Sequence, residues 1–212
     1  MSEPGSTADS SVVSTAEREF GLTPGQFPFE SRFVEMDGAR LHYVNEGEGP
    51  VLLLIHGNPA WSFLYRHVIR DLSTGYRCIA VDLAGFGLSR PPEGFGFLPS
   101  EQAELVRAFI DELDLTAVTL VAHDWGGPIG LAALTARPDR LAAVSLGNTW
   151  AWPVADDRHF RQFSGVMGGP VGRFLNRSFA FFVNVVMPMS MKRRKLTPDE
   201  MRAYRAPFHA RA

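Results

Sequence analysis

A single cysteine, Cys78, occurs in the 212 residues, which excludes an internal disulfide framework and any metal site built from several cysteines. It stands inside the apolar run 77–81, so we expect a buried strand residue and no reactive thiol. The chain also has no apolar run of the roughly 20 residues that span a bilayer. The most apolar stretch, 179–191, is interrupted by Asn184 and Pro188, so we expect no membrane-spanning helix.

We also expect no secretory leader. Residues 1–20 are small, polar and acidic, without the basic start and apolar stretch of a signal peptide. We therefore expect residues 1–25 to form a disordered tail and the protein to be cytoplasmic.

A strong net charge of one sign is absent, because 21 basic and 23 acidic residues give −2. The acidic excess lies in residues 1–150 and the basic excess in residues 151–212. The basic cluster 192–195 is short and indicates a solvated helix end or loop, so we expect no nucleic-acid or membrane partner. The composition, 45% hydrophobic and 21% charged, is that of a globular protein and excludes a mainly disordered or fibrous chain.

The first part of the chain alternates apolar strand patterns with amphipathic helix patterns. Continuous apolar runs are typical of strands covered on both faces, and their alternation with helices predicts an α/β fold with a mostly parallel, doubly wound sheet. We assign residues 26–150 to this core. The expected strands cover 40–44, 51–55, 78–81, 117–122 and 141–146, and the expected helices cover 100–113 and 126–136.

The alternation stops from Trp150 onward. Residues 151–212 are rich in Phe, Met, Gly and Arg, and they contain no apolar run comparable to the earlier strands. This change predicts a second unit, a helical cap domain that lies over the sheet.

The strongest chemical signal is the segment 121–127, where an apolar strand pattern ends and a helix pattern begins. Small residues stand on either side of Asp124, at Ala122 and Gly126, in the pattern of a nucleophile elbow. A carboxylate is ionised at neutral pH and attacks saturated carbon bearing a good leaving group, which forms an ester with the enzyme. The alternative is an aspartate that only caps the following helix.

Two further loops follow predicted strands, at the sheet edge where ligands bind. In the segment 56–59 we expect Asn58 to act in binding and His56 to be structural. The segment 82–92 contains a Gly-x-Gly pair, but it lacks the third glycine and the helix of a dinucleotide site. We interpret it as an ordered turn held by hydrogen bonds to Asp82.

The segments 56–66, 82–90 and 123–127, in this order, resemble the α/β-hydrolase family, and more closely its haloalkane dehalogenases. The resemblance covers residues 27–152 well and the cap more loosely. It implies an α/β-hydrolase core with a helical cap, and an enzyme that needs no cofactor and no metal ion.

The resemblance implies that Asp124 displaces halide from a small halogenated aliphatic substrate. A histidine-activated water then hydrolyses the ester to release the alcohol. The Trp125 indole N–H and the Asn58 side-chain amide hold the halide ion in this scheme, and the Trp125 backbone N–H stabilises the oxyanion of the second step. The implied partners are therefore the halogenated substrate, water and halide.

The same resemblance implies two more strands, a terminal helix, a triad acid and a catalytic histidine after the cap. We expect these to be missing from the chain, because residues 206–212 resemble a cap exit, and we do not expect His209 to be the base. A complementing C-terminal chain is the partner that this expectation suggests.

Two other functions stay open. An epoxide hydrolase shares the aspartate nucleophile and the tryptophan after it, but that class uses cap tyrosines to activate the epoxide. Tyr204 is the only tyrosine of the predicted cap. The other alternative is non-enzymatic, an inactive remnant or a partner-dependent module whose strand 141–146 is an apolar edge prone to aggregation.

Overall fold

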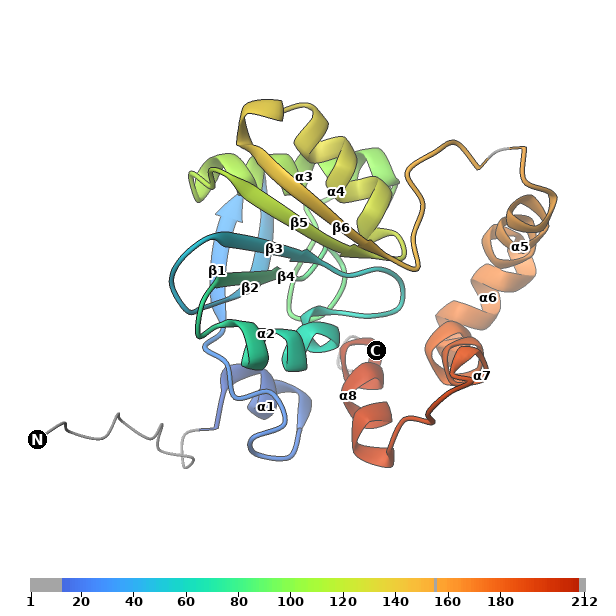
Figure 1. The fold of residues 1–212 in the computed structure, drawn as a ribbon. Coiled ribbons are helices and arrows are strands. Elements are labelled where there is room, and N and C mark those ends of the chain that lie inside the picture. Colours follow the sequence, from blue (N-terminus) through green and yellow to red (C-terminus); the bar gives the residue numbers. More distant parts are fainter. Residues whose placement is uncertain (1–12, 155, 210–212) are drawn as a thin grey trace, which may run out of the picture.

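A computed structural model describes residues 13–154 and 156–209. The strands are β1 (Arg32–Met36), β2 (Ala39–Glu46), β3 (Val51–Ile55), β4 (Arg77–Val81), β5 (Val118–His123) and β6 (Leu141–Gly147). Within the described residues they form one mixed sheet in the order β1-β2-β4-β3-β5-β6 (Figure 1). β1 pairs antiparallel with β2 and β2 antiparallel with β4, whereas all pairs among β3, β4, β5 and β6 are parallel.

The five predicted strands are confirmed as β2 to β6, and Cys78 is buried within β4. β1 was not predicted from the sequence, because none of its five residues is fully buried and its own apolar signal is weak. Its pairing with β2, which sets Phe33 opposite His42, fixes it in the sheet.

Helices lie on both faces of the sheet. The α-helices of the described residues are α1 (Thr15–Phe20), α2 (Arg66–Leu72), α3 (Pro99–Glu112), α4 (Gly126–Thr135), α5 (Arg158–Gly168), α6 (Pro170–Phe179), α7 (Met187–Ser190) and α8 (Pro198–His209). The segments η1 (Ser62–Tyr65) and η2 (Pro138–Arg140) are 3₁₀-helices, and η3 (Phe182–Val186) is a π-helix. α3 and α4 cover one face, and α2 lies against the other (Figure 1). The predicted doubly wound arrangement is therefore confirmed.

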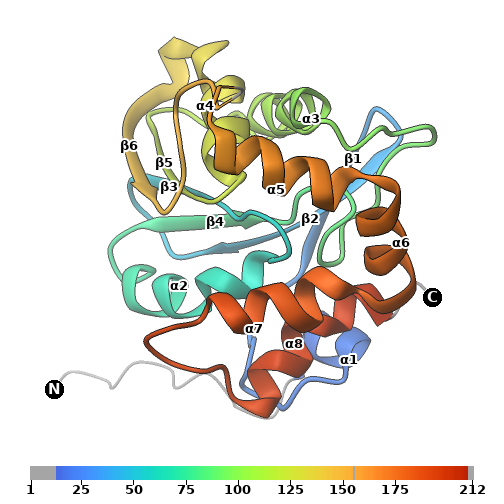
Figure 2. The same cartoon turned by 90° about the vertical axis from the view of Figure 1, so that its right-hand side faces the viewer.

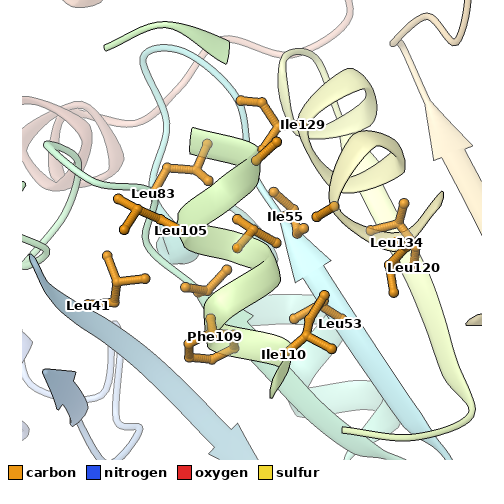
Figure 3. Packing of buried hydrophobic residues seen from close by; sticks show 14 of the residues in the cluster. Leu41, Leu53, Ile55, Leu83, Leu105, Phe109, Ile110, Leu120, Ile129 and Leu134 are labelled. Carbon is orange, nitrogen blue, oxygen red and sulfur yellow. The ribbon is translucent and has the colours of Figure 1, made fainter. Parts of the chain in front are cut away.

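The core is divided by the sheet into two apolar clusters, because successive residues of β3 point to opposite faces. Leu53 and Ile55 join the cluster under α3 and α4, and Leu52 and Leu54 join the cluster under α2. Figure 3 shows the first cluster, where α3 turns one side toward β3. The buried apolar side chains of α3 recur at the helical spacing expected from the sequence, at Ala103, Val106, Phe109 and Ile110.

The segment 13–25 is not the disordered tail predicted for it. Ser14 accepts a hydrogen bond from the Glu17 N–H (3.2 Å), and the Glu17 carboxylate accepts one from the Ser14 N–H (3.1 Å), which makes a capping box for α1. Glu17 also accepts a hydrogen bond from the Phe27 N–H (2.9 Å) and so ties α1 to the core. The rest of the predicted tail, residues 1–12, lies outside the described residues.

The helices α5, α6 and α7 lie beyond the carboxyl ends of the parallel strands (Figures 1 and 2). α8 returns to the core, where the Trp61 indole N–H donates a hydrogen bond to the carbonyl oxygen of Ala203 (3.0 Å). Arg66 and Glu200 form an ion pair at 2.6 Å. The basic cluster 192–195 is exposed, and its Arg194 pairs with the same Glu200.

β6 is an edge strand among the described residues, with Val144 and Leu146 each 42% exposed. A parallel edge strand with exposed apolar side chains is a site of association with other chains. None of the described helices is both long enough and apolar enough to cross a membrane.

Candidate active site

Asp124 lies in a sharp turn between β5 and α4, with a left-handed φ of +54°. A residue with a Cβ rarely adopts this conformation, so neighbouring contacts must hold it. The Asp124 N–H donates to the carbonyl oxygen of Asn148 (3.2 Å). Its own carbonyl oxygen accepts hydrogen bonds from the Gly127 N–H (3.1 Å) and the Thr149 hydroxyl (2.5 Å). The backbone thus has the geometry that the elbow pattern predicts.

Gly126 lets α4 start close to β3. A Cβ at this position would lie 2.1 Å from the carbonyl oxygen of Ile55, so a larger residue would push the helix away from the strand. The small residue required by the sequence pattern therefore has a direct steric reason.

The loop after β3 reaches the Asp124 side chain through its backbone. The Asn58 N–H donates a hydrogen bond to Oδ1 of Asp124 (2.9 Å). Gly57 makes this approach possible, because a Cβ there would lie 2.2 Å from the same oxygen. The sequence drew attention to the Asn58 side chain, and it did not predict this main-chain contact.

His56 is fully buried, and both of its ring nitrogens are engaged. Nε2 accepts a hydrogen bond from the Leu83 N–H (3.0 Å), and Nδ1 lies 2.9 Å from the carbonyl oxygen of Gly57. Since a backbone N–H only donates and a carbonyl oxygen only accepts, the ring is neutral with its proton on Nδ1. Burial lowers the pKa of His56 and favours the same state. His56 is therefore structural, as expected, and shapes the loop that carries Asn58.

Asp82 is the fully buried centre of the second loop. Its Oδ1 accepts a hydrogen bond from the Ser62 N–H (2.7 Å), and its Oδ2 accepts one from the Leu88 N–H (2.9 Å). His42 Nδ1 also lies 2.7 Å from Oδ2. Burial acts to raise the pKa of Asp82, but His42 and the Ser62 hydrogen bond outweigh it and lower that pKa below its usual value. Asp82 thus orders the turn, as the sequence indicated.

Two cavities meet at Asn58. One, of 320 Å³, is lined by Asn58, Trp125, Leu83, Phe86, Phe97, Pro99, Gln102 and Ile129. The other, of 270 Å³, is lined by Asn58, Pro59, Asn176, Ala180, Phe182, Val183 and Phe208. Both walls are mainly apolar, and the structure brings Asn58 and Trp125 to the same cavity beside Asp124.

The Trp125 ring is fixed by the first residues after β6. It stands edge-on to Trp150 with the ring centroids 4.9 Å apart, and Phe160 of α5 lies 6.1 Å away. The start of the cap therefore orients one of the two predicted halide donors.

The described residues contain no group of three or more His, Cys, Asp or Glu side chains placed to hold a metal ion. His123, next to Asp124, has a buried Nδ1 without a hydrogen-bond partner. The side chain of His209, which was not expected to be the base, lies outside the described part of the chain.

The sheet order, the strained aspartate turn and the cap define the class of protein. A family model of the alpha/beta hydrolase fold matches residues 50–208, and the chain belongs to this family. Within it, the chain is similar to haloalkane dehalogenases, as the motifs predicted. It is 44% identical over 176 residues to haloalkane dehalogenase 2 of Mycobacterium tuberculosis strain H37Rv, which covers 83% of this chain and 61% of that protein.

Two more comparisons extend this result. The crystal structure of haloalkane dehalogenase DatA from Agrobacterium tumefaciens C58 matches with a TM-score of 0.76 at 31% identity, over 86% of this chain and 64% of that one. A cis-3-alkyl-4-alkyloxetan-2-one decarboxylase of Shewanella oneidensis is 33% identical over 187 residues, 86% of this chain and 59% of that protein. The chain thus spans about three fifths of the length of the curated relatives it matches.

Proposed function

We propose that the site breaks a carbon–halogen bond by nucleophilic attack of Asp124 on the halogen-bearing carbon. The observation that carries the proposal is the hydrogen bond from the Asn58 N–H to Oδ1, which orients the carboxylate beside an apolar cavity. A carboxylate oriented next to an apolar cavity is suited to attack a neutral haloalkane, because the transition state spreads the charge that it already carries.

In the first step, the free oxygen Oδ2 attacks carbon from the side opposite the halogen. The O–C bond forms while the C–X bond breaks, and the halide leaves with the bonding electrons. The proposal assigns the Trp125 indole N–H and the Asn58 side-chain amide as donors to this halide, since both residues line the 320 Å³ cavity. Hydrogen bonds to an anion in a low-dielectric cavity stabilise it more than they would in water.

The product of this step is an ester in which Oδ1 has become the carbonyl oxygen. The Asn58 N–H already points at Oδ1, so it is placed to stabilise negative charge there when water attacks the ester. We assign it this role together with the Trp125 N–H. The attacking water needs a base, and we propose a histidine for that role; His56 does not fill it, because both of its nitrogens are occupied.

An epoxide hydrolase is the competing reaction of the same nucleophile. It needs an acidic hydroxyl above the aspartate, and the only tyrosine of the cap, Tyr204, is buried and packs against Phe63 at 5.3 Å between ring centroids. Tyr204 does not line either cavity at Asn58. The position of Tyr204 therefore favours carbon–halogen cleavage.

The test is incubation of the chain with 1-bromohexane, followed by intact-protein mass measurement and bromide determination. We expect bromide release, with either one hexyl group on Asp124 or free hexanol. The variant Asp124→Asn should release no bromide above background, whereas Asp139→Asn, at an exposed turn, should behave as the unmodified chain.

Equal bromide release by the chain and by Asp124→Asn would overturn the proposal. Two further probes separate the alternatives. Diol formation from an epoxide without any bromide release would indicate an epoxide hydrolase. Conversion of a dialkyl oxetan-2-one alone would indicate the reaction named for the Shewanella relative, and inertness toward all three probes would indicate a non-enzymatic module.

A further inference from the structure

A second set of nucleophile, base and acid lies away from Asp124. The Ser31 hydroxyl is 3.1 Å from Nε2 of His42, and Nδ1 of His42 is 2.7 Å from Oδ2 of Asp82. His42 and Asp82 are fully buried, whereas Ser31 is partly exposed. The three side chains thus form a continuous serine–histidine–aspartate relay with its serine toward solvent.

The sheet brings these residues together. In the β1–β2 pair, Phe33 stands opposite His42, so Ser31, two residues before Phe33, projects on the same face as the His42 ring. In the β2–β4 pair, Tyr43 stands opposite Val81, and the next residue, Asp82, donates its N–H to the His42 carbonyl oxygen (2.9 Å). Three chain segments, each held by strand pairing, therefore set the relay.

The direction of the proton relay follows from its partners. Oδ2 of Asp82 lies 2.7 Å from His42 Nδ1, and a carboxylate oxygen accepts, so Nδ1 of His42 carries the proton of this hydrogen bond. With its proton on Nδ1, the ring presents the lone pair of Nε2 to the Ser31 hydroxyl. Since Asp82 is also held by the Ser62 and Leu88 N–H groups, the ring that it orients is fixed.

We propose that Ser31 is an activated nucleophile that takes an acyl group from esters with a good leaving group. In this step Oγ of Ser31 bonds to the acyl carbon and its proton moves to Nε2 of His42. The bond from the acyl carbon to the leaving oxygen breaks, and the phenolate departs with the bonding electrons. Aryl esters are the expected class, because a stable phenolate requires the least help in leaving.

Ser31, the proposed nucleophile, lies apart from the site at Asp124. Neither Ser31 nor His42 lines the two cavities at Asn58. β1 and β2, which carry the relay, occupy the end of the sheet opposite β6. Loss of haloalkane cleavage would therefore leave the Ser31 reaction in place.

The experiment is acylation of the whole chain with p-nitrophenyl acetate, with acid quenching at set times and mapping of acetyl groups by peptide mass spectrometry. Exposed Ser100, which has no histidine partner in the described structure, is the internal reference. We expect Ser31 to be acetylated about 100-fold faster than Ser100, the size of a general-base effect. The Ser31 rate should also fall in D₂O, because a proton moves in the acylation step.

The controls separate activation from exposure. Ser31→Ala should abolish the fast release of p-nitrophenolate while leaving bromide release from 1-bromohexane unchanged, and Ser100→Ala should alter neither. Asp124→Ala should retain Ser31 acetylation. In concentrated urea the preference for Ser31 should vanish. Acetylation of Ser31 at the rate of Ser100, or none at Ser31, would overturn the proposal and leave the relay a purely structural network.

Discussion

The backbone N–H of Asn58 donates a 2.9 Å hydrogen bond to Oδ1 of Asp124, across 66 residues of sequence. The contact joins the loop after β3 to the turn after β5. These strands are parallel neighbours, so their carboxyl ends meet at one edge of the sheet. The nucleophile is thus oriented by a loop that belongs to a different strand.

The close approach of Gly57 to Asp124 predicts the effect of adding one methyl group. In Gly57→Ala the new Cβ would lie 2.2 Å from Oδ1, so the carboxylate must shift. We expect alkylation of Asp124 by 1-bromohexane to slow about 100-fold, the typical consequence of misplacing a reacting group by about 1 Å. Adduct mass against time measures the rate. Gly75→Ala, where nothing lies within 4 Å, is the control and should react as the unmodified chain.

The indole N–H of Trp125 is predicted to hold the leaving halide. Trp125→Phe keeps an aromatic ring against Trp150 but removes the donor. We expect bromide release to slow about 100-fold, as for loss of one donor to a developing anion, with little change in melting temperature. Trp152→Phe, at a side chain 66% exposed, should leave the rate unchanged. A full rate in Trp125→Phe would exclude the indole as a halide donor.

The elbow depends on glycine at position 126. In Gly126→Ala the Cβ would meet the Ile55 carbonyl oxygen at 2.1 Å. We expect the free energy of unfolding to fall by about 1–3 kcal/mol, the usual cost of overpacking. Gly165→Ala, in α5 with nothing within 4 Å, should raise it by about 0.5–1 kcal/mol, because alanine favours the helix. Urea denaturation measures both, and equal effects would contradict the steric argument.

Glu200 ties the cap to the core and predicts an acid-dependent loss of stability. The hydrogen bond from Arg194 lowers the pKa of Glu200 to about 2, from 4.5 in an unperturbed chain. Because the pKa of Glu200 is lower in the folded chain than in the unfolded chain, ionised Glu200 contributes to the free energy of unfolding. This contribution is present above pH 4.5 and is lost as the pH falls from 4.5 toward 2. Glu200→Gln should lower the free energy of unfolding by about 2 kcal/mol at neutral pH, since it weakens charged hydrogen bonds with Arg66 and Arg194.

Urea denaturation at pH values from neutral to 3.5 checks this prediction. The difference in the free energy of unfolding between the unmodified chain and Glu200→Gln should shrink below pH 4.5. Glu104→Gln is the control, because Glu104 is 68% exposed and pairs only across one helical turn with Arg107. Its effect should stay within about 0.5 kcal/mol. A constant difference at every pH would show that the Glu200 charge does not contribute.

Local sequence patterns were sufficient for much of the fold. Residues 51–55 were predicted as a strand covered on both faces because the run is continuously apolar, and β3 confirms this. Residues 117–122 were predicted in the same way; β5 is a strand there, but its residues alternate between buried and half-buried, so only one of its faces is fully covered. Asp124 was recognisable because the small residues that permit its turn are its neighbours in the chain. By contrast, α1 was not predicted, because it has little apolar surface to reveal it in the sequence. Its capping box and the hydrogen bond from the Phe27 N–H to Glu17 stabilise it instead.

The sequence by itself determined the alternation of β3 to β6 with helices α3 and α4, the aspartate at the elbow and the membership of the α/β-hydrolase family. Only the tertiary structure decided which atoms meet: the Asn58 N–H at Asp124, the neutral tautomer of His56, and the relay from Ser31 to Asp82. Side-chain periodicity is local and can be read along the chain. Hydrogen bonds between residues tens of positions apart depend on which strands are neighbours and in which register they pair.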